Sequence, residues 1–127
     1  MSMIDTPLMR GLERVLDRSS FRQQLISTNL ANVDTPGYRT RDLGRFSGEL
    51  QQAMTQAMDT TGEEAPAFPA VARAVPNLLE RPDGNNVSVE RESLLMAQNQ
   101  LHFQVAVAFL KAEFHRLSLA INGGSSS

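Results

Sequence analysis

The sequence has no cysteine and no tryptophan among its 127 residues. Without cysteine the chain forms no disulfide, supplies no thiolate nucleophile and holds no zinc through sulfur. No stretch approaches the roughly 20 consecutive apolar residues of a transmembrane helix. The first eleven residues include Asp5 and Pro7 and contain no apolar run, unlike a cleavable signal peptide. By these rules the protein is soluble and stays where it is made, unless a specialised export route reads a signal that is not cleaved.

A strong net charge is also missing. The chain carries 12 basic and 14 acidic residues, for a net charge of -2, so no strong field points to nucleic acid or to an acidic membrane. Lys111 is the only lysine, and all other basic residues are arginine. Because arginine forms bidentate pairs at interfaces, this composition favours protein contacts. The length predicts one ordinary domain, or one modest domain with a loose segment, and in either case a core that is not large.

The sequence contains no pattern typical of an active site or a metal centre. His102 and His115 are far apart, and no set of histidine and acidic residues has metal-ligand spacing. Residues 83–86 are similar to the start of a calcium loop, but the downstream ligands are missing, which favours a turn. Glu90 and Glu92 are interpreted as acids in the first turn of a helix, where the helix dipole favours negative charge. Glu113 is interpreted as a surface charge. We therefore expect no enzyme activity, no cofactor and no metal.

An amphipathic helix is predicted over residues 6–32. Thr6 is suited to cap its first turn, and Pro7 suits the first helical position. Apolar and small residues recur at alternating steps of three and four, which is a near-heptad seam. The residues of this seam are Met9, Leu12, Leu16, Ser19, Gln23, Ile26, Leu30 and Val33, with Leu8, Val15 and Leu25 beside them.

A second long helix is predicted from about residue 88 to residue 121. Ser88 is a suitable N-cap, and residues 122–124 are expected to end the helix ahead of a frayed tail. The same three-and-four spacing gives a seam of Val89, Ser93, Met96, Asn99, Phe103, Ala106, Leu110, Phe114, Leu117 and Ile121. Val105, Val107 and Phe109 make the middle of this helix apolar on more than one side. Such a helix is usually buried by more than one neighbour, so partners from other chains are expected.

The middle of the chain has a weaker pattern. Residues 47–58 have the spacing of a short helix, and residues 59–69 predict a loop or a disordered segment. Leu78 and Leu79 indicate a short extended piece that enters a tight turn at residues 82–85. The middle has room for a small β-hairpin, but the pattern assigns no strand positions. The predicted fold is therefore mainly α, with the two terminal helices packed as a coiled-coil-like core. We divide the chain into residues 1–38, a variable middle of residues 39–87, and residues 88–127.

The densest local signal lies at the end of the first helix. Residues 35–38, Thr-Pro-Gly-Tyr, suit a type II turn, in which Pro36 presets φ and Gly37 supplies a positive φ. Asn29 and Asn32 share one helical face and are placed to bond either the turn backbone or an opposing helix. The conformational preferences of these residues indicate a capped helix followed by a turn, and they do not by themselves indicate a function.

This stretch closely resembles the N-terminal motif of the flagellar rod and hook axial proteins, in which a long helix ends in a run like Asn-x-x-Asn-x-x-Thr-Pro-Gly-Tyr. The matching residues are Asn29, Asn32, Thr35, Pro36, Gly37 and Tyr38. A second stretch, residues 83–92 followed by residues 94–101, is similar to the start of the C-terminal helix in a rod member of that family. Its most distinctive residues are Asp83, Gly84, Asn85 and Asn86. The two matches cover roughly half of the chain, and residues 44–82 match no known pattern.

The resemblance implies a structural subunit of the basal-body rod that is exported unfolded by the flagellar type III apparatus, without cleavage, and stacks helically across the periplasm as part of the drive shaft. It implies as partners copies of the chain itself, other rod proteins, the adaptor protein FliE, and components of the membrane ring and export gate. Neither nucleic acid nor a small-molecule substrate is implied. We expect helix packing and assembly to depend on Leu12, Leu16, Ile26, Leu30, Met96, Phe103, Leu110, Phe114, Leu117 and Ile121.

Two alternatives stay open at the level of sequence. The chain can be a different rod protein of the same family. It can also be a soluble helical adaptor or chaperone that binds a partner through the same seams and forms a discrete dimer or small complex. A small enzyme is a third reading, but no constellation of residues supports it.

Overall fold

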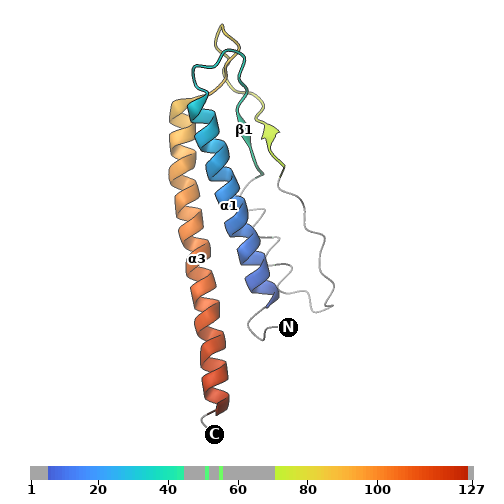
Figure 1. Ribbon diagram of the computed structural model, residues 1–127, viewed down its shortest axis with the longest axis vertical. Coiled ribbons are helices and arrows are strands. Elements are labelled where there is room, and N and C mark those ends of the chain that lie inside the picture. Colours follow the sequence, from blue (N-terminus) through green and yellow to red (C-terminus); the bar gives the residue numbers. More distant parts are fainter. Residues whose placement is uncertain (1–5, 45–50, 52–54, 56–70, 126–127) are drawn as a thin grey trace.

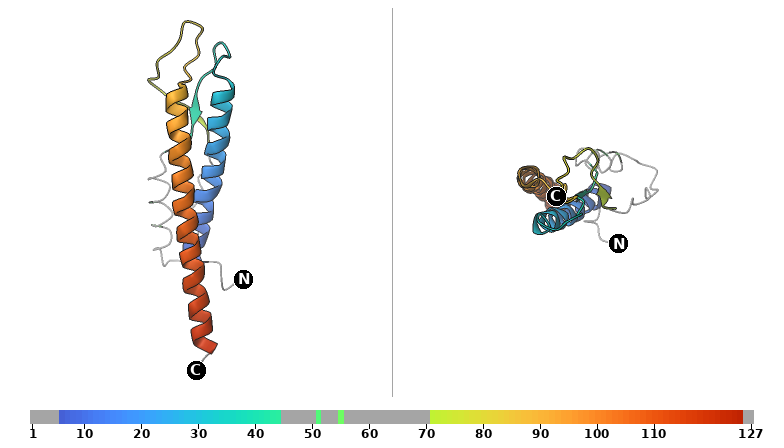
Figure 2. Two further views of the ribbon diagram at one scale, coloured as in Figure 1. Left: turned by 90° about the vertical axis from the view of Figure 1, so that its left-hand side faces the viewer. Right: turned by 90° about the horizontal axis from the view of Figure 1, so that it is seen from above.

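The structure is a computed structural model that describes residues 6–44, 51, 55 and 71–125. Two long helices, α1 (Pro7–Ala31) and α3 (Val89–Ser125), lie side by side along most of the length of α1 (Figures 1 and 2). Two short strands, β1 (Arg41–Asp42) and β2 (Arg73–Ala74), pair antiparallel beside α1. The predicted fold, mainly α with two packed terminal helices and a small β element in the middle, is confirmed.

The β element joins segments that are distant in sequence. Arg41 pairs with Ala74 and Asp42 pairs with Arg73, so the two strands flank the long middle segment instead of the tight turn at residues 82–85. Most of the short helix predicted at residues 47–58 lies outside the described residues. Gln51 and Thr55 are described and both are helical, with the Thr55 hydroxyl donating to the Gln51 carbonyl at 2.8 Å.

The start of α1 follows from local capping chemistry. Thr6 has an extended backbone, and its side-chain oxygen accepts a hydrogen bond from the Met9 amide at 3.1 Å. Pro7 occupies the first helical position, where a missing amide proton costs nothing. At the other end, the Asn32 amide donates back to the carbonyls of Thr28 and Asn29 at 3.1 and 3.2 Å. The predicted cap and both predicted ends of this helix are confirmed.

The start of α3 is also confirmed, but its predicted end is wrong. Ser88 accepts a hydrogen bond from the Arg91 amide at 3.3 Å and so caps the first turn. The helix then continues through Gly123 to Ser125, although residues 122–124 were expected to end it. A glycine stops a helix by taking a positive φ, and among the described glycines only Gly37 and Gly84 do so.

The buried side of α1 is broader than the predicted seam because the helix has two neighbours. Along α1 the buried residues are Met9, Gly11, Leu12, Val15, Ser19, Arg22, Ile26 and Asn29. Leu16, Gln23 and Leu30 are half-buried, and in each case the preceding residue is buried instead. That shift turns the buried side partly toward β1, which packs against α1 on the flank that α3 leaves open.

The buried line of α3 is mostly polar. Residues spaced seven apart face α1: Glu92, Asn99, Ala106 and Glu113. The prediction that Glu113 is a surface charge is therefore wrong, and Glu92, expected to act on the helix dipole, is fully buried as well. These carboxylates tolerate burial because each has a charged or amide partner, Arg91 and Asn29 for the first and Arg116 for the second. Among the described residues, Val15 and Ala106 form a buried apolar cluster, with Leu16 packed against it.

The two helices differ in length by about three turns. α1 has 25 residues and α3 has 37, which at about 1.5 Å per residue gives ~37 Å and ~55 Å. The cap of α1 lies at the level of Glu113, since the Thr6 side chain is one of its hydrogen-bonding neighbours. Residues 114–125 of α3, which we call the overhang, extend past the start of α1 (Figure 1). Within the described part of the chain, neither helix is both long and apolar enough to cross a membrane.

Candidate functional site

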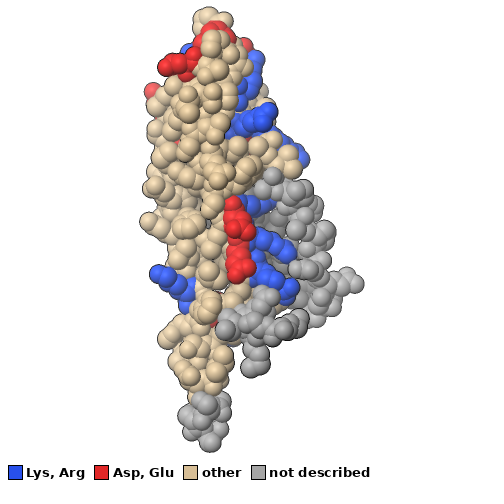
Figure 3. Space-filling model, in the orientation of Figure 1, with Lys and Arg blue, Asp and Glu red and all other residues tan. Residues whose placement is uncertain are grey.

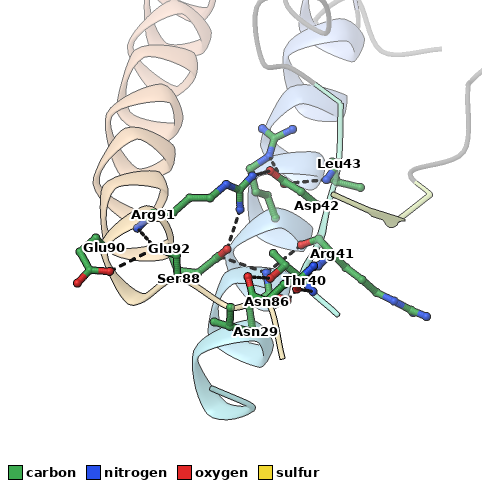
Figure 4. A network of polar contacts seen from close by, with 12 residues as sticks. Asn29, Thr40, Arg41, Asp42, Leu43, Asn86, Ser88, Glu90, Arg91 and Glu92 are labelled. Carbon is green, nitrogen blue, oxygen red and sulfur yellow. Dashed lines mark hydrogen bonds and ion pairs between the residues drawn. The ribbon is translucent and has the colours of Figure 1, made fainter. Parts of the chain in front are cut away.

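Asn29 is the centre of a polar network where the end of α1 meets the start of α3 (Figure 4). Its side-chain oxygen accepts hydrogen bonds from the Tyr38 hydroxyl at 2.8 Å and from the Arg41 amide at 3.2 Å. Its side-chain nitrogen donates to the Arg41 carbonyl at 2.9 Å and to the Glu92 carboxylate at 3.2 Å. One buried amide thus uses both of its donors and both of its acceptor positions, and it joins the turn, β1 and α3.

Ion pairs extend this network across three elements. Arg91 on α3 contacts the Glu92 carboxylate at 2.8 Å and the Asp42 carboxylate at 3.6 Å. Asp42 on β1 also pairs with Arg22 of α1, whose side chain is nearly buried, at 3.3 Å. Buried ion pairs add little net stability, but removing one partner leaves a charge without compensation. The network therefore favours one relative placement of α1, β1 and α3 over others.

Asn85 makes a second bridge between the two ends of the chain. Its buried side-chain nitrogen donates to the carbonyls of Asn32 and Thr35, both at 2.8 Å. Its side-chain oxygen accepts from the Val87 amide at 2.8 Å. The same two carbonyls also accept from the Thr35 and Tyr38 amides, so Asn85 adds a second hydrogen bond to each and joins the second motif to the turn that follows α1.

Asn86 pairs with Thr40 in the same way. The Thr40 amide donates to the Asn86 side-chain oxygen at 2.7 Å, and the Thr40 hydroxyl donates to the Asn86 carbonyl at 3.3 Å. The Asn86 amide in turn donates to the Tyr38 carbonyl at 3.4 Å. Both Thr40 and Asn86 are buried, so these bonds form in a protected environment where they are strong.

Gly37 and Gly84 allow the two turns to touch. Both have positive φ values, of 74° and 85°, and the Gly37 amide donates to the Asp83 carbonyl at 2.9 Å. The amide of Tyr38 donates to the Thr35 carbonyl at 3.2 Å, which closes the predicted turn. A Cβ atom on Gly84 would lie 3.3 Å from the Gly37 Cα atom, so the close approach requires glycine.

Replacing Gly84 with alanine is expected to destabilise the chain by about 2 kcal/mol, because the side chain is strained at positive φ and crowds the Gly37 backbone. The free energy of unfolding in urea measures this change. Gly44→Ala is the matched control, since nothing lies within 4 Å of its added Cβ and its expected change is below about 0.5 kcal/mol. Equal losses for both variants would contradict the tight contact between the turns.

The structure brings together motif residues that the sequence placed at opposite ends of the chain. Of the ten motif residues predicted from the sequence, Asn29, Asn32 and Tyr38 all contact the 83–92 stretch. We call residues 29–42 and 80–92 together the motif junction. Sequence reasoning missed the partners Thr40, Asp42 and Glu92. The unusual density of asparagine beside turn glycines was a usable signal, because buried amides must find partners.

Two buried carboxyl groups respond to pH in opposite directions. Burial raises the pKa of Glu92, and the hydrogen bond from Asn29 and the charge of Arg91 only partly oppose this. The hydrogen bonds from Arg116, with the Arg116 charge and the Thr6 side chain, lower the pKa of Glu113 despite its burial. Stability contributed by Glu92 is therefore complete in acid and lost as pH rises through its folded pKa. Stability contributed by Glu113 is present near neutral pH and lost as pH falls through its folded pKa.

Glu92→Gln and Glu113→Gln are expected to change the pH dependence of stability with opposite signs. Between about pH 3 and 7, the first variant should gain stability relative to the wild type as pH rises above about 4.5, and the second should lose stability as pH rises toward about 4.5, because the pKa of Glu92 is raised above its ordinary value and that of Glu113 is lowered below it. Urea unfolding of each purified chain across this range tests the pair. A shift in the same direction for both would show that their environments are wrongly assigned.

The outer side of α3 carries a row of exposed apolar residues, which we call the outer stripe. Leu94, Leu101 and Leu119 are each about 60% exposed, and Val105 lies between them on the same side. Across the described residues, every large apolar side chain that is exposed on a helix belongs to α3 and none to α1. An apolar row of this length on one helix is typical of a protein–protein contact.

The residues predicted for packing and assembly divide into three groups. Leu12 and Ile26 are buried between the helices, whereas Leu16, Leu30, Met96, Leu110 and Leu117 are half-buried. Phe103, Phe114 and Ile121 are exposed on α3. His102 is half-buried and His115 exposed, and no group of three or more metal-ligating side chains gathers in the residues that the structure describes.

Comparison with known proteins gives relatives along almost the whole chain. No family model matches. The flagellar basal body rod protein FlgB of Salmonella typhimurium is 30% identical, with 92% of this chain and 94% of that protein aligned. FlgB of Aeromonas hydrophila is 32% identical over 82% of this chain and 84% of its own length. FlgB of Bacillus subtilis is 27% identical, covering 91% and 94% respectively.

Proposed function

Because this chain belongs to the FlgB family of flagellar basal body rod proteins, we propose that it is a proximal rod subunit that assembles helically through its terminal helices. In this proposal the flagellar type III apparatus exports the chain into the periplasm, and the assembled rod transmits torque as part of the drive shaft. The role is structural, and the proposal assigns no catalytic residue.

The outer stripe of α3 is the observation that supports assembly. α1 covers only one side of α3, so an apolar row that includes Leu94, Leu101 and Leu119 is left for other chains. In the proposal, neighbouring rod subunits cover this stripe. Burying such area is favourable by about 25 cal/mol per Å², which gives the subunit more stability in the rod than alone.

The small core between the helices supports export as an unfolded chain. Among the described residues, the buried line of α3 contains one apolar residue, Ala106, and the buried apolar side chains are Met9, Leu12, Val15, Ile26, Val87 and Ala106. A domain with so little buried apolar surface is marginal and unfolds readily. In the proposal, neighbours complete the core after export, and these neighbours include FliE and components of the membrane ring and export gate.

The motif junction supports a role in carrying load. It fixes the end of α1 to the start of α3 through buried amides and ion pairs, so a twist applied to one helix passes to the other. We propose that residues 1–38 and 88–127 form the part of each subunit that builds the rod, with residues 39–87 as the variable part.

Deletion and complementation test this function. A strain without the gene is expected to lack complete basal bodies and not to swim, and the wild-type chain supplied from a plasmid should restore both. The matched control is the same plasmid with a stop codon in place of the Leu101 codon. It should restore neither basal bodies nor swimming. Intact basal bodies and normal swimming in the deletion strain would contradict the proposal, as would recovery of the chain only as a closed soluble dimer, which is the behaviour of an adaptor or chaperone.

A further inference from the structure

The α3 helix keeps its acids and an amide inside and most of its large apolar side chains outside. Glu92, Asn99 and Glu113 are buried against α1 at intervals of seven and fourteen residues, and Ala106 completes the buried line of α3. Residues 93–110 carry no lysine, arginine, aspartate or glutamate, and the helix is largely uncharged through its middle in Figure 3. The usual order of an amphipathic helix, apolar inside and charged outside, is thus reversed on α3.

Two polar residues of the buried line meet matching groups on α1. The Glu92 carboxylate accepts a hydrogen bond from the Asn29 side chain at 3.2 Å. The Asn99 side-chain nitrogen donates to the Ser19 carbonyl at 3.0 Å and to the Gln23 side-chain oxygen at 3.2 Å. An acid therefore meets an amide in one layer of the interface, and an amide meets a carbonyl and a second amide in the next.

The other two layers are matched as well. Ala106 packs against Val15 in an apolar layer. Glu113, the last residue before the overhang, has Thr6 at the cap of α1 among its hydrogen-bonding neighbours. Because the two helices run antiparallel (Figure 1), the partner groups follow in reverse order along the chain, from Asn29 to Thr6.

The layer at Asn99 costs stability. The Ser19 hydroxyl oxygen and the Asn99 side-chain oxygen are buried, and neither has a hydrogen-bond partner among the described residues. Atoms of this kind cost free energy when they are buried. An asparagine at one core position of a coiled coil also lowers stability, but it fixes the register and the partner of the helix. The polar groups of the buried line therefore affect which pairing forms more than how stable it is.

A slip of α3 along α1 by one heptad destroys the match. In the observed register Val15 lies against Ala106. A slip of seven residues in one direction brings Asn99 opposite Val15, and a slip in the other direction brings Glu113 there. Either slip buries a polar side chain against an apolar one without a partner, which is unfavourable.

Pairing of α3 with the α3 helix of another copy meets a similar obstacle. If two α3 helices overlap through their buried lines, Glu92 lies opposite Glu113 in an antiparallel pair, and each acid lies opposite its own copy in a parallel pair. Two carboxyl groups buried side by side cannot both stay ionised. The amide and hydroxyl groups that bind these acids come from Asn29 and Thr6, which α3 does not supply.

We propose that the polar residues of the buried line select the partner and the register of α3, so that it accepts α1 in one alignment and rejects both a shifted α1 and the α3 of another copy. The inference deepens the proposed function and rests on it for its setting. A chain that folds after export, close to identical copies, has to pair α3 with α1 before the outer stripe meets a neighbour. An entirely apolar line would pair the helices with much less discrimination.

Disulfide formation in the purified chain reports the pairing, and the natural chain contains no cysteine to interfere. The reporter Val15→Cys/Ala106→Cys places two thiols in the apolar layer, where they are adjacent only in the observed register. In the otherwise wild-type chain, oxidation is expected to give mainly the intrachain disulfide. Adding Asn99→Leu/Glu113→Leu, which we call the line variant, is expected to raise the ratio of interchain to intrachain product about tenfold or more.

Gln98→Leu/Gln104→Leu is the matched control, because it adds two leucines at exposed positions of α3 outside the buried line. This control is expected to keep the wild-type ratio of interchain to intrachain product. A second measurement is the urea midpoint, which should be at least as high in the line variant as in the wild type, because leucine replaces buried polar groups.

The outcomes separate this inference from the proposed function. An unchanged disulfide ratio in the line variant would overturn the inference, and so would an equal rise in the control, since pairing would then follow total apolar surface. A lower urea midpoint in the line variant would also overturn it, because the polar residues would then supply stability instead of selection. Absence of the wild-type chain from basal bodies would overturn the rod function and leave the pairing result standing.

Discussion

Replacing Leu101 with glutamate is expected to abolish swimming while leaving the isolated chain as stable as the wild type. Leu101 lies in the middle of the outer stripe and is 59% exposed, so the free chain accommodates a charge there with a change within about 0.5 kcal/mol. In an assembled rod the same carboxylate would be buried without a partner, which costs several kcal/mol. Since each ~1.4 kcal/mol is a factor of ten, incorporation should fall about 100-fold or more.

Incorporation is measured as the amount of the chain in purified basal bodies relative to hook protein. Gln104→Glu is the matched control, because it adds the same charge to an exposed position of α3 outside the outer stripe. It should leave swimming and incorporation close to wild type. Normal incorporation of the Leu101→Glu chain would show that the outer stripe faces solvent in the rod. That result would remove the main support for assembly through α3.

Replacing Asn29 with alanine should produce the largest loss of stability of any single polar substitution in the motif junction. The change removes four hydrogen bonds and leaves the buried Glu92 carboxylate and the partly buried Arg41 backbone groups with fewer partners. Buried polar groups without partners cost about 1–3 kcal/mol each, so a total loss of about 3 kcal/mol is expected. For a small domain this is a large part of the total stability.

Urea unfolding of the purified chain measures this loss. Asn32→Ala is the matched control, since the Asn32 side chain bonds to Thr28 and Thr35 in exposed positions, and its backbone carbonyl still accepts from Asn85. Its expected cost is below about 1 kcal/mol. If both asparagine variants lose the same stability, Asn29 does not have the central position assigned to it.

Local features of the fold could be predicted from the sequence because they depend on neighbours in the chain. The caps at Thr6 and Ser88 and the turn at Gly37 are set by a few adjacent residues, and each lies where the pattern placed it. The resemblance in the two motif stretches indicated the family correctly. Each stretch combines a turn glycine with asparagines at fixed spacing, which is an unusual combination.

Long-range features could not be predicted in the same way. The spacing of the apolar residues does not reveal that β1 is a second neighbour of α1. The prediction therefore put Leu16 and Leu30 on the buried side, whereas the residues before them, Val15 and Asn29, are the buried ones. The burial of Glu92 and Glu113 depends on partners from other parts of the chain, Asn29 for one and Thr6 for the other. The end of α3 was misplaced because a glycine permits a helix to stop but does not force it.

The location of the subunit in the basal body tests the central claim most directly. Basal bodies purified from a strain whose only copy of the chain carries a small C-terminal label can be imaged by electron cryo-microscopy. The account predicts label density around the proximal end of the rod, next to the membrane ring, in several copies per basal body. A rod without label, together with a labelled chain that is recovered in solution as a closed dimer, would contradict it.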